Sequence, residues 1–249
     1  MLSISQPGLL MPYTMHWFSE HPPSPLQNWR PMVYWCCRDV GVVAGFKRQQ
    51  VATRIVSLNQ PWEEIESRFV KDTAYEMRRA ARDGVQPLFD QDLALFLDFY
   101  RTFAKQKGLG VPRLEELKGY LGHVTIGKAL LGNEPLVMNF YIMDSTSQRV
   151  RMLYSASHFR TMSDPANRYL VGRANRFLHR EAMRFFKNQG FSYYDLGGFA
   201  PESQDPAVMA INRFKESIGG SLLWEVHYTS LMVRLTQSVR AWMKDLGGR

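Results

Sequence analysis

Two acidic residues in the second half of the chain have sequence surroundings that suit proton transfer. Asp195 lies near the end of the apolar run 193–196, before Gly197 and Gly198, and Glu225 lies in a later apolar run. A carboxylate at a strand end, beside flexible backbone, can take a proton from an attacking amine or orient the group that does. We therefore predict Asp195 as a general base and Glu225 as its rival. The alternative is an Asp195 that only stabilises its own turn.

A glycine opens the longest helical pattern of this half, which we predict from Gly172 to Gln189. The unpaired N–H groups at the start of a helix bind anions, and a glycine there lets a ligand approach the backbone closely. Arg173 and Asn175 add hydrogen-bond donors. We predict that Gly172, Arg173 and Asn175 bind the phosphates of a ligand, the alternative being an ordinary helix start.

Basic residues recur along this helix, and the whole chain has 31 basic and 23 acidic side chains, a net charge of +8 and a pI near 9.6. Such a surplus favours a polyanionic partner, namely a nucleotide, coenzyme A, tRNA or an anionic membrane surface. The helical stripe either binds phosphates or is the solvated face of an amphipathic helix. Its members are Arg173, Arg176, Arg180, Arg184 and Lys187.

Several other chemistries lack their motifs in this sequence. The six histidines show no metal-ligand spacing, so we expect no metal site, and no nucleotide-binding glycine loop or nucleophile elbow is present. Cys36 and Cys37 are adjacent, which disfavours a disulfide between them and fits a reducing compartment. We see neither a signal peptide nor an apolar run long enough to span a bilayer, and we expect a cytoplasmic protein.

The pattern of residues 1–123 predicts an N-terminal extension, 1–50, that carries a β-hairpin from the apolar runs 32–36 and 41–46. Strands and helices then alternate. We predict strands at 53–58 and 85–89, and helices at 61–82, 93–107 and 113–121.

The remainder predicts an antiparallel meander followed by helices and further strands. The predicted strands are 124–131, 136–142, 150–157, 191–196, 221–228 and 231–235, and a short helix spans 207–216. This order indicates an α/β (α+β) domain, 51–235, with a mixed, mostly antiparallel central sheet flanked by helices. The final segment, 236–249, reads as an amphipathic basic helix that packs on the sheet or makes peripheral contact with a membrane.

Four short motifs occur in a characteristic order: YSAS at 154–157, LVGRANRFLH at 170–179, GFSYYDLGG at 190–198 and INRFKESIGG at 211–220. An upstream segment, EMRRAARDGV at 76–85, precedes them. Together they resemble the Fem-type branch of the GNAT-like (acyl-CoA N-acyltransferase fold) superfamily, and the resemblance covers roughly residues 53–228.

The resemblance implies a GNAT-like fold in which the Gly172 region holds the donor's pyrophosphate. It places Phe214, Lys215 and Asn212 near the acyl end of the donor, where Lys215 offsets negative charge or stabilises the tetrahedral oxyanion. A further set lies on a strand that splays from its neighbour and exposes backbone donors to the acyl carbonyl, with Tyr154 as the acid for the leaving thiolate. That set is Tyr154, Ser155 and Ser157.

The function implied is an N-acyltransferase that acylates an amine on a glycan or peptide precursor of the envelope or of a polysaccharide. The sequence departs from the family in two respects. Fem-type enzymes usually carry two such domains and a coiled-coil arm, and acetyl-CoA enzymes usually carry more than the one glycine of 171–175. We expect acyl-CoA as donor ahead of aminoacyl-tRNA. The alternative function is a non-catalytic module that binds RNA or an anionic glycan.

Overall fold

The computed structural model describes residues 1–8, 11–21, 23–158 and 164–238. Its contacts form two compact units, one of Met1–Ala52 with Trp224–Arg249 and one of Thr53–Leu223. The sequence suggested boundaries at 50 and 235 instead. The difference arises because the last strand leaves the second unit and pairs within the first.

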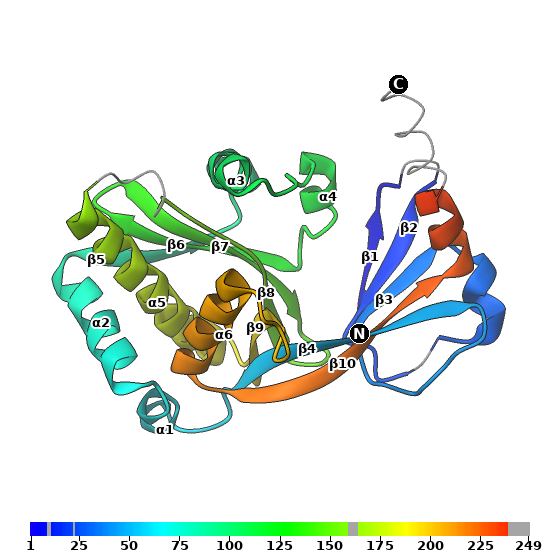
Figure 1. Ribbon diagram of the computed structural model, residues 1–249, viewed down its shortest axis with the longest axis horizontal. Helices are drawn as coiled ribbons and strands as arrows, with labels where there is room; N and C mark the ends of the chain where they lie inside the picture. Colours follow the sequence, from blue (N-terminus) through cyan, green and yellow to red (C-terminus); the bar gives the residue numbers. More distant parts are fainter. Residues whose placement is uncertain (9–10, 22, 159–163, 239–249) are drawn as a thin grey trace. The chain divides into compact units, whose positions relative to one another are not determined.

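The first unit has strands joined in the order β1-β2-β3-β10 (Figure 1). They are β1 (Leu2–Gln6), β2 (Tyr13–Trp17), β3 (Met32–Cys37) and the later part of β10 (Ser221–Ser230), with a 3₁₀ helix, η1 (Pro25–Trp29), before β3. β2 and β3 are parallel, whereas β3 and β10 are antiparallel. Cys36 and Cys37 are both buried, and no disulfide joins them.

The predicted hairpin of 32–36 with 41–46 is wrong. β3 pairs with β2 and β10, and residues 38–45 contain no strand. Gly41 and Gly45 have φ values of +82° and +80°, which turn the chain out of an extended conformation. The next strand, β4 (Phe46–Ser57), begins only after this turn.

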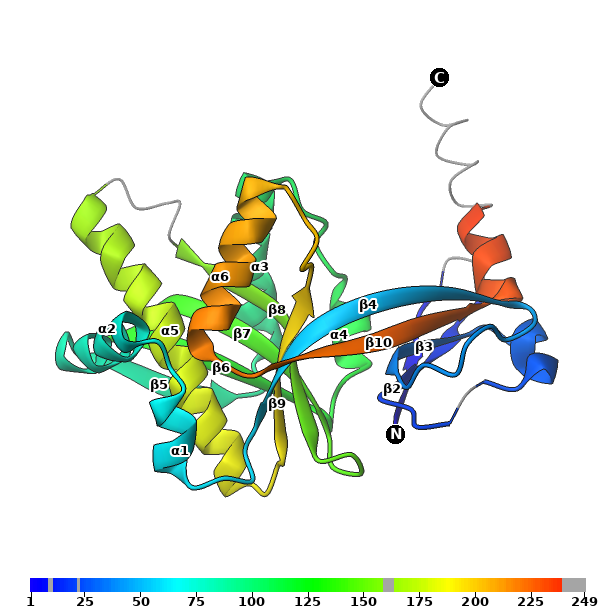
Figure 2. The same ribbon diagram turned by 60° about the horizontal axis from the view of Figure 1, so that its bottom comes forward.

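The second unit is built on strands in the order β4-β9-β8-β7-β6-β5 (Figure 2). They include β5 (Val85–Asp90), β6 (Val124–Leu131), β7 (Glu134–Asp144), β8 (Arg149–Ser157) and β9 (Tyr193–Phe199). Pairing is antiparallel from β5 to β8, as the predicted meander required, and β8 and β9 are parallel. The mixed, mostly antiparallel α/β architecture is confirmed.

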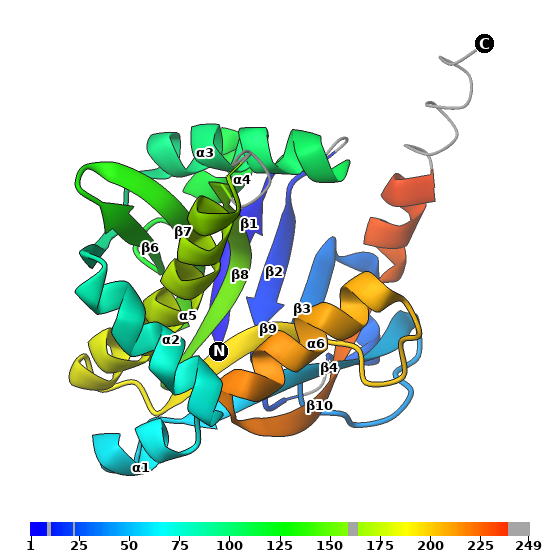
Figure 3. The ribbon, with the colours of Figure 1, turned by 60° about the vertical axis from the view of Figure 1, so that its left-hand side comes forward.

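Helices cover both faces of this sheet (Figures 1 and 3). α3 (Leu93–Lys107) and α4 (Leu114–Lys118) lie on one face, and α1 (Trp62–Ser67), α2 (Lys71–Arg82), α5 (Pro165–Asn188) and α6 (Pro206–Ile218) lie on the other. Successive side chains of β7 point to opposite faces of the sheet. Phe140 packs on Phe96 of α3, and Tyr141 packs on Phe186 of α5.

Two helical predictions need correction. The helix expected over 61–82 is interrupted at 68–70, because the backbone N–H of Val70 donates to Ser217 O of α6 at 3.0 Å instead of continuing α1. Residues 231–238 are helical rather than a strand. The rest of the predicted C-terminal helix, 239–249, lies outside the described residues.

Candidate functional site

The parallel strands β8 and β9 pair over a short stretch and then part. Their register joins Arg149 to Tyr193, Val150 to Tyr194 and Arg151 to Asp195. Gly197, two residues after Asp195, still lies close to β8: a Cβ there would be 2.9 Å from Met152 O. β8 then continues to Ser157, paired on its other side with β7. Alternate backbone groups of 153–157 therefore point to the side from which β9 has separated.

A cavity of about 800 Å³ lies at this end of β8. Its walls come from the end of α3, the end of β8, the first half of α5 and the middle of α6. It brings together four of the residues predicted from sequence to bind the donor, namely Ser157, Gly172, Asn175 and Phe214. Three basic side chains also line it, Lys107, Arg168 and Arg176, of which only Arg176 belonged to the predicted basic stripe.

Gly172 does not open its helix, so the predicted anion site at its N–H groups is wrong. α5 begins at Pro165, and the Asp164 carboxylate caps it by accepting from Asn167 N at 3.2 Å. Gly172 instead lies inside the helix and lines the cavity. A Cβ at this position would meet only Arg176 Nη1, at 3.7 Å. The missing side chain therefore leaves space in the cavity.

The basic stripe of α5 faces the acidic residues of α1 and α2. Arg173 pairs with Asp83 at 2.7 Å and Arg176 with Glu76 at 2.9 Å. Arg180 contacts Glu66 at 2.7 Å and Glu181 at 2.6 Å, and Arg184 lies over the Trp62 ring. The stripe is thus largely compensated within the fold. Arg173 does not line the cavity, whereas Arg176 does.

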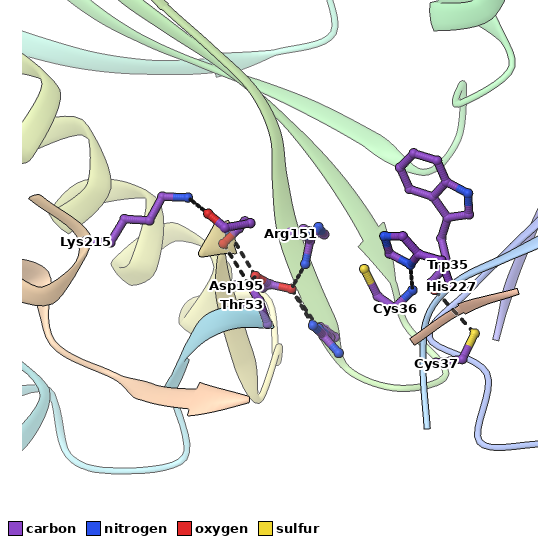
Figure 4. Close-up of polar contacts among 11 residues, drawn as sticks. Trp35, Cys36, Cys37, Thr53, Arg151, Asp195, Lys215 and His227 are labelled. Carbon is purple, nitrogen blue, oxygen red and sulfur yellow. Dashed lines mark hydrogen bonds and ion pairs between the residues drawn. The ribbon is translucent and has the colours of Figure 1, made fainter. Parts of the chain in front are cut away.

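Asp195 is fully buried in a cluster of hydrogen bonds (Figure 4). Its Oδ1 accepts from Gly197 N at 2.8 Å and from the Thr53 hydroxyl. Its Oδ2 accepts from Arg151 Nη1 at 2.6 Å and from Arg149 Nε at 3.2 Å. Both oxygens are therefore engaged by donors from β4, β8 and β9.

This environment keeps the Asp195 carboxylate ionised. Burial alone would raise its pKa, but Arg151, Arg149 and the Thr53 hydroxyl outweigh that effect and hold the pKa well below the usual range of a carboxyl. A group with so low a pKa is a weak proton acceptor at neutral pH.

Lys215 is a buried amine beside the Asp195 cluster (Figure 4). Its Nζ donates to Gly198 O at 2.5 Å. Burial lowers its pKa to about 8, with a further contribution from Arg151, while Asp195 acts in the opposite direction. Phe214, the preceding residue of α6, lines the cavity, so Lys215 lies close behind its wall. Asn212 has a different place: its amide donates to Ala200 O at 2.7 Å and holds the loop after β9.

The other predicted residues do not line the cavity. The Tyr154 ring packs on Tyr100 of α3, and Ser155 faces Asn139 across the β7–β8 ladder. Glu225 is buried in β10 and belongs to the first unit. The catalytic roles of these residues stay predictions.

The sequence analysis missed a buried network of hydrogen-bonded side chains under α5. His179 Nδ1 lies 2.7 Å from Tyr194 Oη, the Tyr194 hydroxyl donates to Tyr141 Oη at 3.1 Å, and the Asn139 amide donates to Tyr141 Oη at 3.0 Å. Burial, followed by Lys215 and Arg176, lowers the pKa of His179 to about 3. The imidazole is therefore neutral at physiological pH. Periodicity alone gave no sign of the network, because its members come from three separate elements.

Among the residues that the structure describes, no cluster of three or more histidine, cysteine, aspartate or glutamate side chains is arranged to hold a metal ion. Over the same residues, no helix combines the length and the apolar character that a membrane crossing needs.

The parallel pair that parts over a cavity, set in a mostly antiparallel sheet, defines a GNAT-like fold, as the sequence motifs of the Fem-type branch predicted. The structure is similar to that of FemX, with a TM-score of 0.60 and 14% identity over 78% of this chain and 68% of that one. It is also similar to the C-terminal domain of a putative lysylphosphatidylglycerol synthetase from Agrobacterium fabrum, with a TM-score of 0.55 and 10% identity over 92% and 80% of the two chains.

A third similar structure is that of L-PGS from Bacillus licheniformis, with a TM-score of 0.52 and 12% identity over 90% of this chain and 75% of that one. At these identities the similarity establishes the fold. No protein-family model and no curated protein sequence matches this chain.

Proposed function

We propose that this protein is an N-acyltransferase that moves an acyl or aminoacyl group from an activated, anionic donor to an amine of an envelope or polysaccharide precursor. The observation that carries the proposal is the cavity of about 800 Å³ beside the edge of β8, with the basic side chains of Lys107 and Arg168 in its wall. A cavity of this size suits a cofactor-sized ligand, and guanidinium and ammonium groups are the usual partners of phosphate.

In this proposal the basic wall binds the donor's phosphates, and the edge of β8 near Ser155 and Ser157 receives the acyl carbonyl. Backbone N–H groups aimed at that oxygen stabilise the negative charge that develops when the amine attacks. The tetrahedral intermediate then expels the donor's leaving group, which takes a proton from Tyr154. Tyr154 contacts Tyr100, and Tyr100 contacts Phe103 of the cavity wall.

Asp195 and Lys215 lie close to the point where β8 and β9 part, and we assign them different roles. Because both oxygens of Asp195 accept hydrogen bonds, we assign it a positioning role that fixes β9 against β8. Glu225 belongs to the first unit and takes no role here, and the proton that the attacking amine releases passes to solvent. Lys215, whose pKa of about 8 leaves it mostly protonated at neutral pH, supplies positive charge to the oxyanion or to the donor.

The donor class has two candidates. Acyl-CoA is the first, because the motifs of this chain resemble those of the acyl-CoA N-acyltransferase fold. An aminoacyl donor is the second, supported by the likeness to the putative lysylphosphatidylglycerol synthetase, whose name states an aminoacylated lipid as product. Both donors are anionic and both fit the basic wall.

No observation favours the non-catalytic alternative. A polyanion-binding module would use the α5 stripe, but Arg173, Arg176 and Arg180 are paired with carboxylates of neighbouring elements. Their charge is thereby reduced as an attraction for an RNA backbone.

A thermal-shift series tests the proposal with CoA, acetyl-CoA, a long-chain acyl-CoA, uncharged tRNA and aminoacyl-tRNA. A ligand at about a hundredfold excess over its Kd stabilises the native state by about 2.7 kcal/mol, so a true donor raises Tm measurably. Gly172→Leu places a large side chain in the cavity and introduces a residue that favours helix formation. It should abolish the rise in Tm.

Gly172→Ala is the matched control, since a Cβ at this position meets its nearest neighbour, Arg176, at an ordinary 3.7 Å. It should keep most of the shift. If none of the five compounds stabilises the wild-type protein, or if the leucine variant responds as the wild type does, the cavity is not a donor site.

A further inference from the structure

Two neighbouring turns of the first unit expose large apolar side chains. η1 carries Leu26 and Trp29, which are 88% and 66% exposed. The loop 38–45 carries Val40 and Val42, which are 41% and 89% exposed. We name these four residues the apolar tip. Single exposed apolar residues are common, but four of them on adjoining turns form a patch that needs a reason.

The two turns are in contact. A Cβ built on Gly45, at the end of the loop, would lie 2.6 Å from Asn28 Cβ of η1. Figures 1 and 2 both show η1 beside the segment that leads into β4. The apolar tip is therefore one feature of the surface rather than two separate ones.

The loop is held rigidly with Val42 facing outward. The Tyr228 hydroxyl donates to Gly41 O at 2.8 Å and accepts from Val40 N at 3.2 Å. Val43 is buried with Tyr34, Phe46 and Tyr228 in the core of this unit. Since Val43 points inward between these rings, Val42 projects into solvent, and ordering the loop costs no further entropy on binding.

η1 is fixed in the same way. Gln27 Oε1 accepts from Ser24 N at 2.9 Å and from the Tyr34 hydroxyl at 3.3 Å. Leu26 and Trp29, on either side of Gln27, are thus presented on a preformed turn.

The surroundings of the apolar tip are basic. Arg30, Arg38 and Lys47 are exposed on the segments that flank it. The one acidic residue between positions 24 and 48 is Asp39, and it forms an ion pair with Arg48. The local surface therefore combines protruding apolar side chains with an excess of positive charge.

We propose that the apolar tip docks the protein on an anionic lipid bilayer. Tryptophan and aliphatic side chains partition into the interface between headgroups and acyl chains, where burial of their apolar surface favours binding. Basic residues near an anionic leaflet add electrostatic attraction. The apolar contribution comes from Leu26, Trp29 and Val42. The electrostatic contribution comes from Arg30, Arg38 and Lys47.

The same features disfavour a protein partner of the usual kind. Side chains that are 88% and 89% exposed project from the surface instead of lining a groove. A symmetric dimer through the apolar tip would place Arg30, Arg38 and Lys47 against like charges of the second copy. An anionic membrane surface has neither disadvantage.

Vesicle flotation tests the proposal with the full chain. The probes are vesicles of phosphatidylcholine alone and vesicles with about a third phosphatidylglycerol, at low and high NaCl. We expect binding to the anionic vesicles that weakens with salt. Leu26→Ser/Val42→Ser should weaken this binding at least tenfold. The matched control is Val70→Ser/Leu121→Ser, which removes two apolar side chains of the second unit that are 51% and 52% exposed, and it should bind as the wild type does.

Three outcomes would overturn the proposal: absence of wild-type binding to the anionic vesicles, equal binding by the Leu26/Val42 variant, or a concentration-dependent dimer that this variant abolishes. The last result would assign the apolar tip to a second copy of the chain. Urea unfolding of each variant verifies that the fold is retained. Thermal shifts with the soluble donors are read in parallel, so failure of membrane docking and failure of the transferase proposal are distinguishable.

Discussion

Arg151 and Asp195 face each other as the last pair of the parallel ladder between β8 and β9, and Arg151 Nη1 lies 2.6 Å from Asp195 Oδ2. Arg149, two residues earlier, reaches the same oxygen. This buried ion cluster joins the two strands immediately before they part. It therefore determines where the open edge of β8 begins.

Replacement of Asp195 by asparagine should destabilise the fold. The neutral amide leaves the guanidinium groups of Arg149 and Arg151 buried without their carboxylate, which typically costs about 3–5 kcal/mol. Urea unfolding at pH 7 measures the change. Arg113→Ala is the control, because it removes a surface pair with Glu116 at 2.9 Å and should cost less than about 1 kcal/mol. Equal losses in the two variants would show that the cluster does not hold the strands.

The buried ammonium of Lys215 should lower the free energy of unfolding at neutral pH. Its pKa falls from 10.5 in the unfolded chain to about 8 in the fold, so between these values the unfolded state binds more protons and the free energy of unfolding rises with pH. Lys215→Met has no buried charge at this position, so its free energy of unfolding at pH 7 should exceed that of the wild type by on the order of 1–3 kcal/mol. The difference should shrink as the pH rises from about 8 to about 10.

The titration of Lys215 should also determine how the rate falls at alkaline pH. Loss of the ammonium as pH rises through about 8 should lower kcat, while the acceptor's need for a neutral amine lowers the rate at acidic pH. Lys215→Arg stays charged and should shift or remove the alkaline limb. If the limb is unchanged in Lys215→Arg, another group titrates there.

Local chemistry was sufficient to predict the meander and the fold class of the second unit. Turn residues between 131 and 149 and the apolar runs around them identified the meander of β6, β7 and β8. The order of the motifs at 154–157, 190–198 and 211–220 indicated the GNAT-like fold, which the structure confirms. Four of the predicted donor-binding residues meet at one cavity, which the end of β8, the first half of α5 and α6 line together.

Long-range contacts explain what sequence reasoning failed to predict. The parallel pairing of β2 with β3 joins a segment for which the sequence predicted no element to one that was predicted as part of a hairpin. Gly172 suggested a helix start because glycine interrupts periodicity, but the cap at Asp164 and Pro165 decides where α5 begins. The arginines of α5 read as a free basic face because their partners, including Glu66, Glu76 and Asp83, lie a hundred residues away in sequence.

His179 predicts a loss of stability in mild acid. Its pKa is lowered to about 3 in the fold from about 6.5 in the unfolded chain, so its contribution is complete above pH 6.5 and is lost as pH falls toward 3. His179→Gln keeps a hydrogen-bonding side chain for the Tyr194 hydroxyl but does not titrate. Relative to this variant, the wild type should lose free energy of unfolding between pH 6.5 and pH 5. Parallel pH curves for the two proteins would contradict the neutral, buried state of His179.

The basic wall of the cavity predicts how donor affinity responds to charge. Arg168 lines the cavity and is exposed, so Arg168→Ala should leave the fold intact and weaken binding of CoA or aminoacyl-tRNA about tenfold, the loss expected for one charge-assisted hydrogen bond. Isothermal titration at several salt concentrations measures it, and the salt dependence should also become shallower.

Arg213→Ala is the matched control for that measurement. Arg213 is an exposed arginine of α6 that does not line the cavity, although its neighbour Phe214 does. Both variants remove one positive charge, so a change in the net charge of the protein affects them equally. If the two variants lose the same affinity, the donor responds to the field of the whole protein. A loss confined to Arg168→Ala places the donor's phosphates against the cavity wall, because only a direct contact distinguishes two arginines of equal charge.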